Sequence, residues 1–205
     1  MEKQQFLFID FEFTMPEKSK NFKGFYPEII EVGIVAVVDD LVKEQFSSYV
    51  IPNRFPILSG RCKSFLHISQ QQVNNGISLL TLMEKLEELS QGFQNSIITW
   101  GNMDLKVLKD NCLKENIPFT IEFEEIDLSM EYKRFFGDQN QTGLWKAVRE
   151  YGREGTGIHH RALDDALTTY HIYKLVEKDK RYLGKPKPPT IGDLIDLSKV
   201  FNKFA

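Results

Sequence analysis

Two carboxylates near the start of the chain are spaced so that one metal ion could bind both. Asp10 and Glu12 lie two residues apart in the apolar run FLFIDFEF. Side chains at positions i and i+2 share one face of a β-strand, so these carboxylates project side by side. Burying two like charges together is costly unless a cation compensates them, and no Lys or Arg is interleaved here. Because Mg²⁺ and Mn²⁺ favour carboxylate oxygens, the pair indicates a divalent metal site.

Two further acidic positions and a histidine pair stand where other elements begin. Asp104 follows the strand-like run SIITW, and the segment HHRALDDA, which contains His160 and Asp165, opens the longest helical pattern. Strand ends and helix starts are where α/β folds gather functional groups. About four carboxylates can hold two ions roughly 4 Å apart for phosphodiester hydrolysis. A histidine that takes a proton from the attacking water adds roughly 10²- to 10⁴-fold, so the set predicts a hydrolytic metal site.

Each of these residues also has a structural explanation. The first strand could end before both of its acids and leave them in a solvated loop. Asp104 is well placed to be the N-cap of a helix. His159 and His160 could both be structural, and Asp164 is expected on a solvated face, paired with Arg161. No single motif decides between these explanations.

The elements that must position these residues follow from the hydrophobic pattern. Phe6–Phe13 is apolar on both faces, which is typical of a central strand covered on each side. The β-branched run 28–40 and the segment 41–51 predict a β-hairpin, and 96–100 is a further short strand. Helical spacing predicts helices over 78–93, with Ser78 as N-cap, and over 105–116, 143–152 and 162–178. The acidic run 122–131 is expected to be a solvated face.

Length and charge bound the class of protein. The chain has 205 residues, of which 41% are hydrophobic, and this suggests one domain with a full core. A formal net charge of −3 argues against a protein that coats nucleic acid by charge alone. Two distant cysteines, no apolar run of membrane length and no targeting segment before the first strand predict a reduced, cytoplasmic protein without a membrane partner.

Three motifs together resemble a known family. DFEFT, WGNMD and HHRALDDA, in this order, resemble the motifs of the DEDDh 3′-end exonucleases, members of the ribonuclease H-like fold. The resemblance covers about residues 5 to 178, and it extends to the branch of enhanced-RNAi exonucleases and bacterial KapD proteins. CKSFLHISQQQV resembles the segment of that branch that grips the terminal nucleotide. Residues 65–69 read FLHIS where the family usually has L-T-G-I-T, so a glycine is missing from this loop.

The resemblance implies a role for each candidate residue of the metal site. Asp10 would bridge two Mg²⁺ or Mn²⁺ ions. Glu12 and Asp165 would complete the ligand set of one ion, and Asp104 would hold the other ion through water. His160 would be the general base.

The resemblance also implies how a substrate is held. Phe13, through its backbone, and Thr14 would contact the terminal nucleotide. Phe65 would wedge the last bases, although it could equally be an ordinary core residue. The expected fold is α/β, a ribonuclease H-like mixed sheet with an antiparallel hairpin and parallel strands, flanked by helices.

The implied activity is metal-dependent 3′-to-5′ hydrolysis of single-stranded RNA or DNA to nucleoside 5′-monophosphates, with a role in regulating sporulation. Residues 1–180 would form the exonuclease domain. Residues 181–205, a basic Pro-rich arm and a C-terminal helix, would pack on the same domain or bind a protein partner. The main alternative is a regulatory binding protein that uses the nuclease fold to inhibit a sporulation kinase pathway. A proofreading subunit is a second alternative, without a recognisable polymerase-docking signature.

Overall fold

The computed structural model describes residues 2–17 and 24–184. The chain divides into two compact units, residues 1–173 and 174–205. Every candidate site residue lies in the first unit. The predicted C-terminal helix lies outside the described residues. None of the helices in the described ranges is long and apolar enough to cross a membrane.

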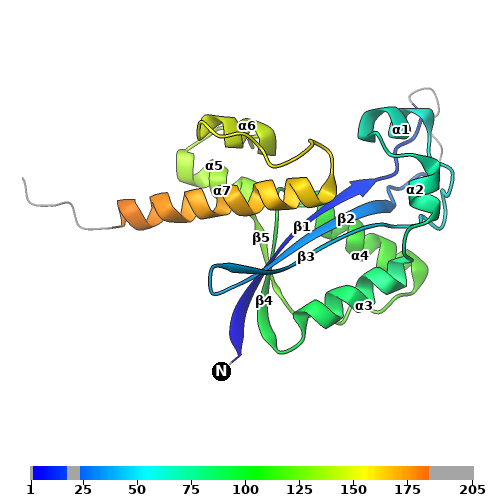
Figure 1. Ribbon diagram of the computed structural model, residues 1–205, viewed down its shortest axis with the longest axis horizontal. Helices are drawn as coiled ribbons and strands as arrows, with labels where there is room; N and C mark the ends of the chain where they lie inside the picture. Colours follow the sequence, from blue (N-terminus) through cyan, green and yellow to red (C-terminus); the bar gives the residue numbers. More distant parts are fainter. Residues whose placement is uncertain (1, 18–23, 185–205) are drawn as a thin grey trace, which may run out of the picture. The chain divides into compact units, whose positions relative to one another are not determined.

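A five-stranded mixed sheet with the order β3-β2-β1-β4-β5 organises the first unit (Figure 1). The central strand, β1 (Lys3–Phe13), pairs antiparallel with β2 (Ile29–Val38), which forms a hairpin with β3 (Leu41–Tyr49). On its other side β1 pairs parallel with β4 (Phe93–Thr99), and β4 pairs parallel with β5 (Glu124–Asp127). The predicted α/β fold with a hairpin and parallel strands is confirmed.

Strand β1 keeps its pairing through both acids. Asp10 lies opposite Gly33 of β2, and Glu12 lies opposite Glu31, before the register shifts between Glu12 and Phe13. The two acids therefore belong to the last part of a hydrogen-bonded strand and not to a solvated loop.

Two helices cover one face of the sheet. They are α3 (Leu79–Ser90) and α4 (Met103–Glu115), and Ser78 caps α3 by accepting the Thr81 N–H. Their apolar side chains form one core cluster with those of alternate β1 residues. The cluster contains Leu7, Ile9 and Phe11 of β1, Leu82, Met83 and Leu86 of α3, and Leu105 and Leu108 of α4. Hydrophobic burial of this face fixes which side of β1 points toward α3 and α4.

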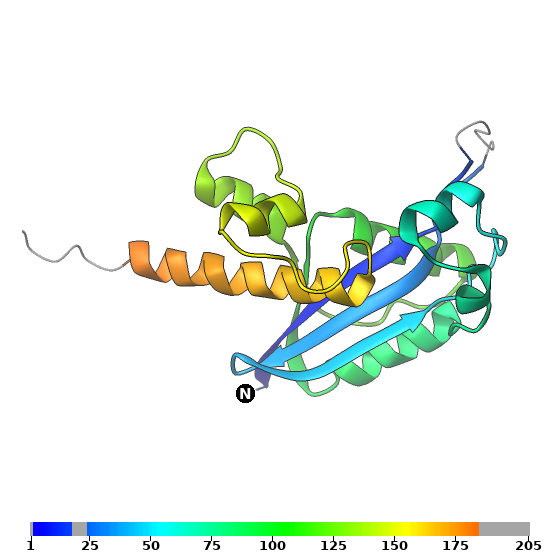
Figure 2. The ribbon, with the colours of Figure 1, turned by 45° about the horizontal axis from the view of Figure 1, so that its top comes forward.

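The opposite face of β1 packs against the first part of α7 (Ala162–Leu183). The Phe8 ring lies 5.1 Å from that of Tyr170 and 5.3 Å from that of Tyr173, between ring centroids. At Gly33 the helix crosses β2 so closely that a Cβ there would lie 2.2 Å from the Ala162 carbonyl carbon, so only glycine fits. Because Gly33 is the partner of Asp10, this crossing brings the first turn of α7 beside Asp10. Figure 2 shows the start of α7 crossing the sheet over β2.

Four further elements were not predicted from the sequence. They are α1 (Gly60–Leu66), α2 (Gln70–Asn74), β5 and α5 (Leu128–Phe136), whereas α6 (Leu144–Glu150) matches the expected short helix. The acidic run 122–131 is not simply a solvated face, because it forms β5 and starts α5. Asp127 accepts the backbone N–H groups of Gly101 and Met130, each at 3.1 Å. Helix α7 also continues to Leu183, five residues beyond the expected end at Lys178.

Candidate active site

Three carboxylates from the two ends of the sequence meet at the end of β1. Asp10 and Glu12 come from β1 and Asp165 from the first turn of α7. Oxygens of the three side chains lie within 4.8 Å of one another, a spacing that one metal ion could bridge. Glu12 is 7% exposed and Asp165 is 6% exposed, so water reaches these charges poorly.

Asp104 reaches the same strand from the opposite helical layer. It lies in the first turn of α4, whose N-cap is Asn102, so the capping explanation for Asp104 is wrong. Its Oδ1 accepts the backbone N–H of Phe11 at 3.1 Å. Because Phe11 lies between Asp10 and Glu12, this bond fixes the Asp104 carboxylate against β1 between the two strand acids.

The acids raise one another's proton affinity. Burial, followed by the charge of Asp104, holds the pKa of Asp10 well above its usual range. Burial also raises the pKa of Glu12 to about 8, with a further contribution from Asp165. The pKa of Asp104 is raised to about 7, mainly by burial. These carboxylates are poorly compensated within the described protein, which is the electrostatic state that a bound cation would relieve.

The nearby cation is already engaged by another acid. Arg161 lowers the pKa of Glu12, but its Nη2 forms an ion pair with Oε1 of Glu31 at 2.9 Å and also donates to the Tyr49 hydroxyl. Glu31 is 2% exposed, and its second oxygen, Oε2, is buried without a hydrogen-bond partner. Burial raises the pKa of Glu31 to about 7. The sequence analysis missed Glu31, because its place opposite Glu12 follows from the register of β2, which the sequence pattern does not show.

His160 lies in a strained turn beside the four carboxylates of Asp10, Glu12, Asp104 and Asp165, which we call the acid cluster. Its φ is +65°, a left-handed conformation that is uncommon for residues other than glycine, and its backbone N–H donates to Asp165 Oδ2 at 3.2 Å. Its Nδ1 lies 3.9 Å from Oε1 of Glu12. Burial, with the neighbouring His159, lowers the pKa of His160. A lowered pKa favours the neutral imidazole, the form that can accept a proton.

The ring of Phe65 packs against that of His160. Its side chain is 49% exposed, so it is not an ordinary core residue, and its ring centroid lies 4.6 Å from that of His160. Two residues later His67 takes φ +54°, the conformation that glycine adopts most easily. The loop therefore keeps a glycine-like backbone although the glycine of the family pattern is absent.

The other two predicted substrate contacts are occupied in part by the protein itself. The Thr14 hydroxyl accepts the Glu28 N–H at 2.9 Å, and its own O–H remains available as a donor. The Phe13 carbonyl lies 3.7 Å from the Cys62 sulfur, which can donate to it. Both residues follow Glu12 directly, so they border the acid cluster.

Asp164 and Asp165 point to different partners. Asp164 is partly buried and its Oδ2 accepts the Ile158 N–H at 2.8 Å, so it does not simply face water and Arg161 as expected. Asp165 Oδ1 accepts the indole N–H of Trp145 on α6 at 2.7 Å. The sequence analysis did not single out Trp145, because nothing in its local pattern shows that its N–H reaches a carboxylate.

Comparison with known proteins decides the family. The sequence profile of the family described as Exonuclease matches residues 7–173. A probable 3′-5′ exonuclease, KapD of Bacillus subtilis (strain 168), is 57% identical over 203 residues, which are 99% of each chain. The solved nuclease domain of 3′hExo, a DEDDh family member bound to rAMP, superposes with a TM-score of 0.74 at 27% identity and covers 86% of this chain and 93% of that one. The chain belongs to the DEDDh family of 3′-5′ exonucleases.

Other relatives of this exonuclease are larger. ERI1 exoribonuclease 2 of Xenopus laevis is 30% identical over 188 residues, which are 80% of this chain but 27% of that protein. The chain therefore spans about a quarter of the length of that relative. DEDDh exonucleases are metal-dependent, and the acid cluster of this one lies where three ligand oxygens converge.

Proposed function

We propose that this exonuclease removes nucleotides from the 3′ end of single-stranded nucleic acid with two Mg²⁺ or Mn²⁺ ions, and that it releases nucleoside 5′-monophosphates. The observation that carries the proposal is the meeting of Asp10, Glu12 and Asp165 within ligand distance of one another, with His160 beside them. This set contains the carboxylates and the neutral base that hydrolysis of a phosphodiester bond requires.

The residues fit divalent ions by their chemistry. Asp10, Glu12, Asp104 and Asp165 offer only hard oxygen ligands, and burial disfavours their charge unless a cation is present. We propose that Asp10 is shared by both ions, that Glu12 and Asp165 complete one, and that Asp104 holds the other through water. When bound, such ions lower the pKa of water and neutralise charge on the phosphate.

His160 and Phe65 supply the remaining parts. We propose that neutral His160 takes the proton of the attacking water, because its pKa is lowered and it lies 3.9 Å from Glu12. The half-exposed Phe65 ring stacks against the terminal bases, and the Thr14 hydroxyl donates to the terminal nucleotide. These groups, acting together beside Glu12, would favour a free end over an internal position of the strand.

RNA is the substrate that we propose first. Relatives of this chain carry the names ERI1 exoribonuclease 2 and 3′-5′ exoribonuclease 1, and the 3′hExo domain is bound to rAMP. Discrimination between RNA and DNA depends on contacts to the 2′-hydroxyl, which these names alone do not locate in this chain.

A regulatory binding protein that has lost catalysis is the rival function. A pure binder would have no need to keep four poorly compensated acids and a neutral histidine together, so the acid cluster favours the enzyme. A role in regulating sporulation stays a prediction.

The decisive experiment uses short 5′-labelled single-stranded RNA and DNA with Mn²⁺ or with EDTA. We expect a ladder of products shortened from the 3′ end with Mn²⁺, faster on RNA, and none with EDTA. A 3′-phosphorylated strand should resist, and nucleoside 5′-monophosphates should accumulate. Cleavage of circular strands would show an endonuclease, and an intact substrate under all conditions would favour the binding protein.

A further inference from the structure

Trp145 contacts both the acid cluster and the loop that carries the histidines. Its indole N–H donates to Asp165 Oδ1 at 2.7 Å, the shorter of the two hydrogen bonds that the Asp165 carboxylate accepts. Its ring centroid lies 4.8 Å from that of His159, which in turn stacks on His160 at 3.8 Å with an interplanar angle of 18°. A single side chain of α6 thus reaches the acid on α7 and the histidine pair.

The loop before α7 is shaped around this ring. At Gly155 a Cβ would lie 2.5 Å from a carbon of the Trp145 ring, so the backbone of the loop lies directly against the indole. Helix α6 is itself fixed, because Leu144, Ala147 and Val148 are buried. The Trp145 ring is therefore fixed by its own helix at one end and by the Gly155 backbone along its edge, and this gives the indole N–H a defined direction.

Geometry of this kind has a known consequence for carboxylate ligands. A side chain that binds a cation through one oxygen needs its rotamer fixed, and a hydrogen bond to the other oxygen achieves this. The indole N–H is a donor only, so it stabilises the ionised carboxylate and cannot serve a protonated O–H as acceptor. Trp100 provides a contrast, because its indole N–H donates to the Thr142 carbonyl at 3.0 Å and to no acid.

We propose that Trp145 is a positioning residue that orients Asp165 for cation binding and braces the loop of His159 and His160. The inference rests on the proposed metal site and adds a residue to it. In this proposal Trp145 acts on the ion only through its hydrogen bond to Asp165. Its effect on the reaction passes through Asp165, and so it is read first in metal affinity.

The test replaces Trp145 by phenylalanine, which keeps a ring against Gly155 and His159 and removes the N–H. Calorimetric titration with Mn²⁺ in the absence of nucleic acid is expected to show roughly 10- to 100-fold weaker binding for Trp145→Phe. Trp100→Phe is the matched control and should bind Mn²⁺ as the wild type does. In hydrolysis, the Mn²⁺ concentration for half-maximal rate should rise for Trp145→Phe, while the rate at saturating Mn²⁺ stays within a few-fold.

A second measurement does not depend on the stability of the Trp145 variant. The chain has two tryptophans, so in Trp100→Phe the emission comes from Trp145 alone. Its emission should change over the same Mn²⁺ concentrations that calorimetry reports.

The outcomes distinguish the proposed role of Trp145 from the proposed metal site. Wild-type protein that binds no Mn²⁺ would refute the proposed metal site. Wild-type binding together with an unchanged affinity in Trp145→Phe, or with an emission that does not respond to Mn²⁺, would overturn the role of Trp145 and leave the metal site standing.

Discussion

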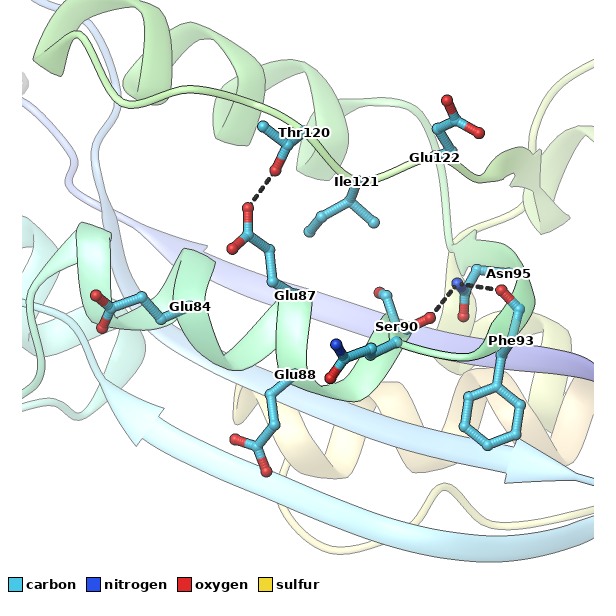
Figure 3. Close-up of a pocket in the computed structure, with 10 residues that line it drawn as sticks. Glu84, Glu87, Glu88, Ser90, Phe93, Asn95, Thr120, Ile121 and Glu122 are labelled. Carbon is cyan, nitrogen blue, oxygen red and sulfur yellow. Dashed lines mark hydrogen bonds between the residues drawn. The ribbon is translucent and has the colours of Figure 1, made fainter.

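Two groups of acids on this molecule look alike in sequence and differ in surroundings. One is the acid cluster of Asp10, Glu12, Asp104 and Asp165. The other lines a hollow of about 510 Å³ between α3 and the segment before β5, and its acids are Glu84, Glu87, Glu88 and Glu122 (Figure 3). We call this hollow the α3 groove.

The acids of the α3 groove are exposed, and two of them have ordinary surface partners. Glu88 pairs with Lys85 at 3.1 Å, and Glu87 accepts a hydrogen bond from Thr120. In the acid cluster, Glu12 and Asp165 are buried, and burial raises the pKa of both. Burial without a compensating cation, and not the number of acids or the size of a cavity, distinguishes a metal site from a solvated acidic surface.

The largest predicted effect removes one charge from each group. Asp10→Asn should lower Mn²⁺-dependent hydrolysis at least about 10³-fold, because an amide ligand cannot replace a carboxylate shared by both ions. Glu87→Gln should leave the rate within a factor of about two. Hydrolysis of labelled RNA measures both, and circular dichroism checks that both variants fold. Undiminished activity in Asp10→Asn would remove the distinction between the two groups.

The next comparison separates two adjacent acids. Asp165→Asn should remove one ion and lower activity strongly, though by less than Asp10→Asn does, whereas Asp164→Asn should change the rate by only a few-fold. The asparagine oxygen at position 164 can still accept the Ile158 N–H. Mn²⁺ stoichiometry by calorimetry, alongside hydrolysis, decides between them. The reverse pattern would reopen the assignment of His160 as well.

Replacing the histidines should lower turnover by less than replacing a member of the acid cluster does, and by different factors for His159 and His160. His160→Ala should lower turnover at least about a hundredfold with little change in metal affinity, because a general base contributes roughly 10²- to 10⁴-fold. His159→Ala removes a stacked ring and should cost at most about tenfold. The assay is the rate at saturating Mn²⁺ against pH, in which the wild type should lose activity at low pH as His160 becomes protonated. Equal losses in both variants would leave the base unassigned.

The smallest predicted effect concerns stability without metal. Glu12 and Glu31 have pKa values of about 8 and about 7, against an ordinary value of 4.5 in the unfolded chain. Between these values the folded protein binds more protons than the unfolded chain, so these groups stabilise it at low pH and their contribution is lost as pH rises toward 8. In EDTA the melting temperature should fall by roughly 5 °C between pH 5 and pH 8.

Added Mn²⁺ should recover that loss at pH 8, because the ion binds ionised carboxylates. Glu88→Gln in the α3 groove should not alter the slope with pH, whereas Asp10→Asn should reduce it. A melting temperature in EDTA that rises with pH would contradict the unfavourable charge state of the acid cluster.

Strands β1 to β4 and the long helices α3, α4 and α7 were predictable because their patterns are local. Strand β1 and the hairpin of β2 and β3 follow from apolar runs, and Ser78 caps α3 as expected. The short elements α1, α2 and β5 were not, because their few residues gain stability from packing on the rest of the unit and show little periodicity of their own.

The candidate site divides in the same way. Asp10, Glu12, Asp104, Asp165 and His160 carry motifs, and the structure brings them together, although their roles stay predictions. Glu31 and Trp145 carry no motif. Their positions depend on the register of β2 and on the docking of α6, which are tertiary facts that no local window of sequence contains.

The meeting of β1 with α7 has a consequence for how the protein is made. Asp10 precedes Asp165 by most of the length of the first unit, so the acid cluster stays incomplete until the start of α7 has been synthesised. Because domains fold as units, the close packing of Ala162 on Gly33 can form only then. A nascent chain therefore holds an unfinished site, and it gains the means to degrade nucleic acid only after α7 has been synthesised and has packed on β2.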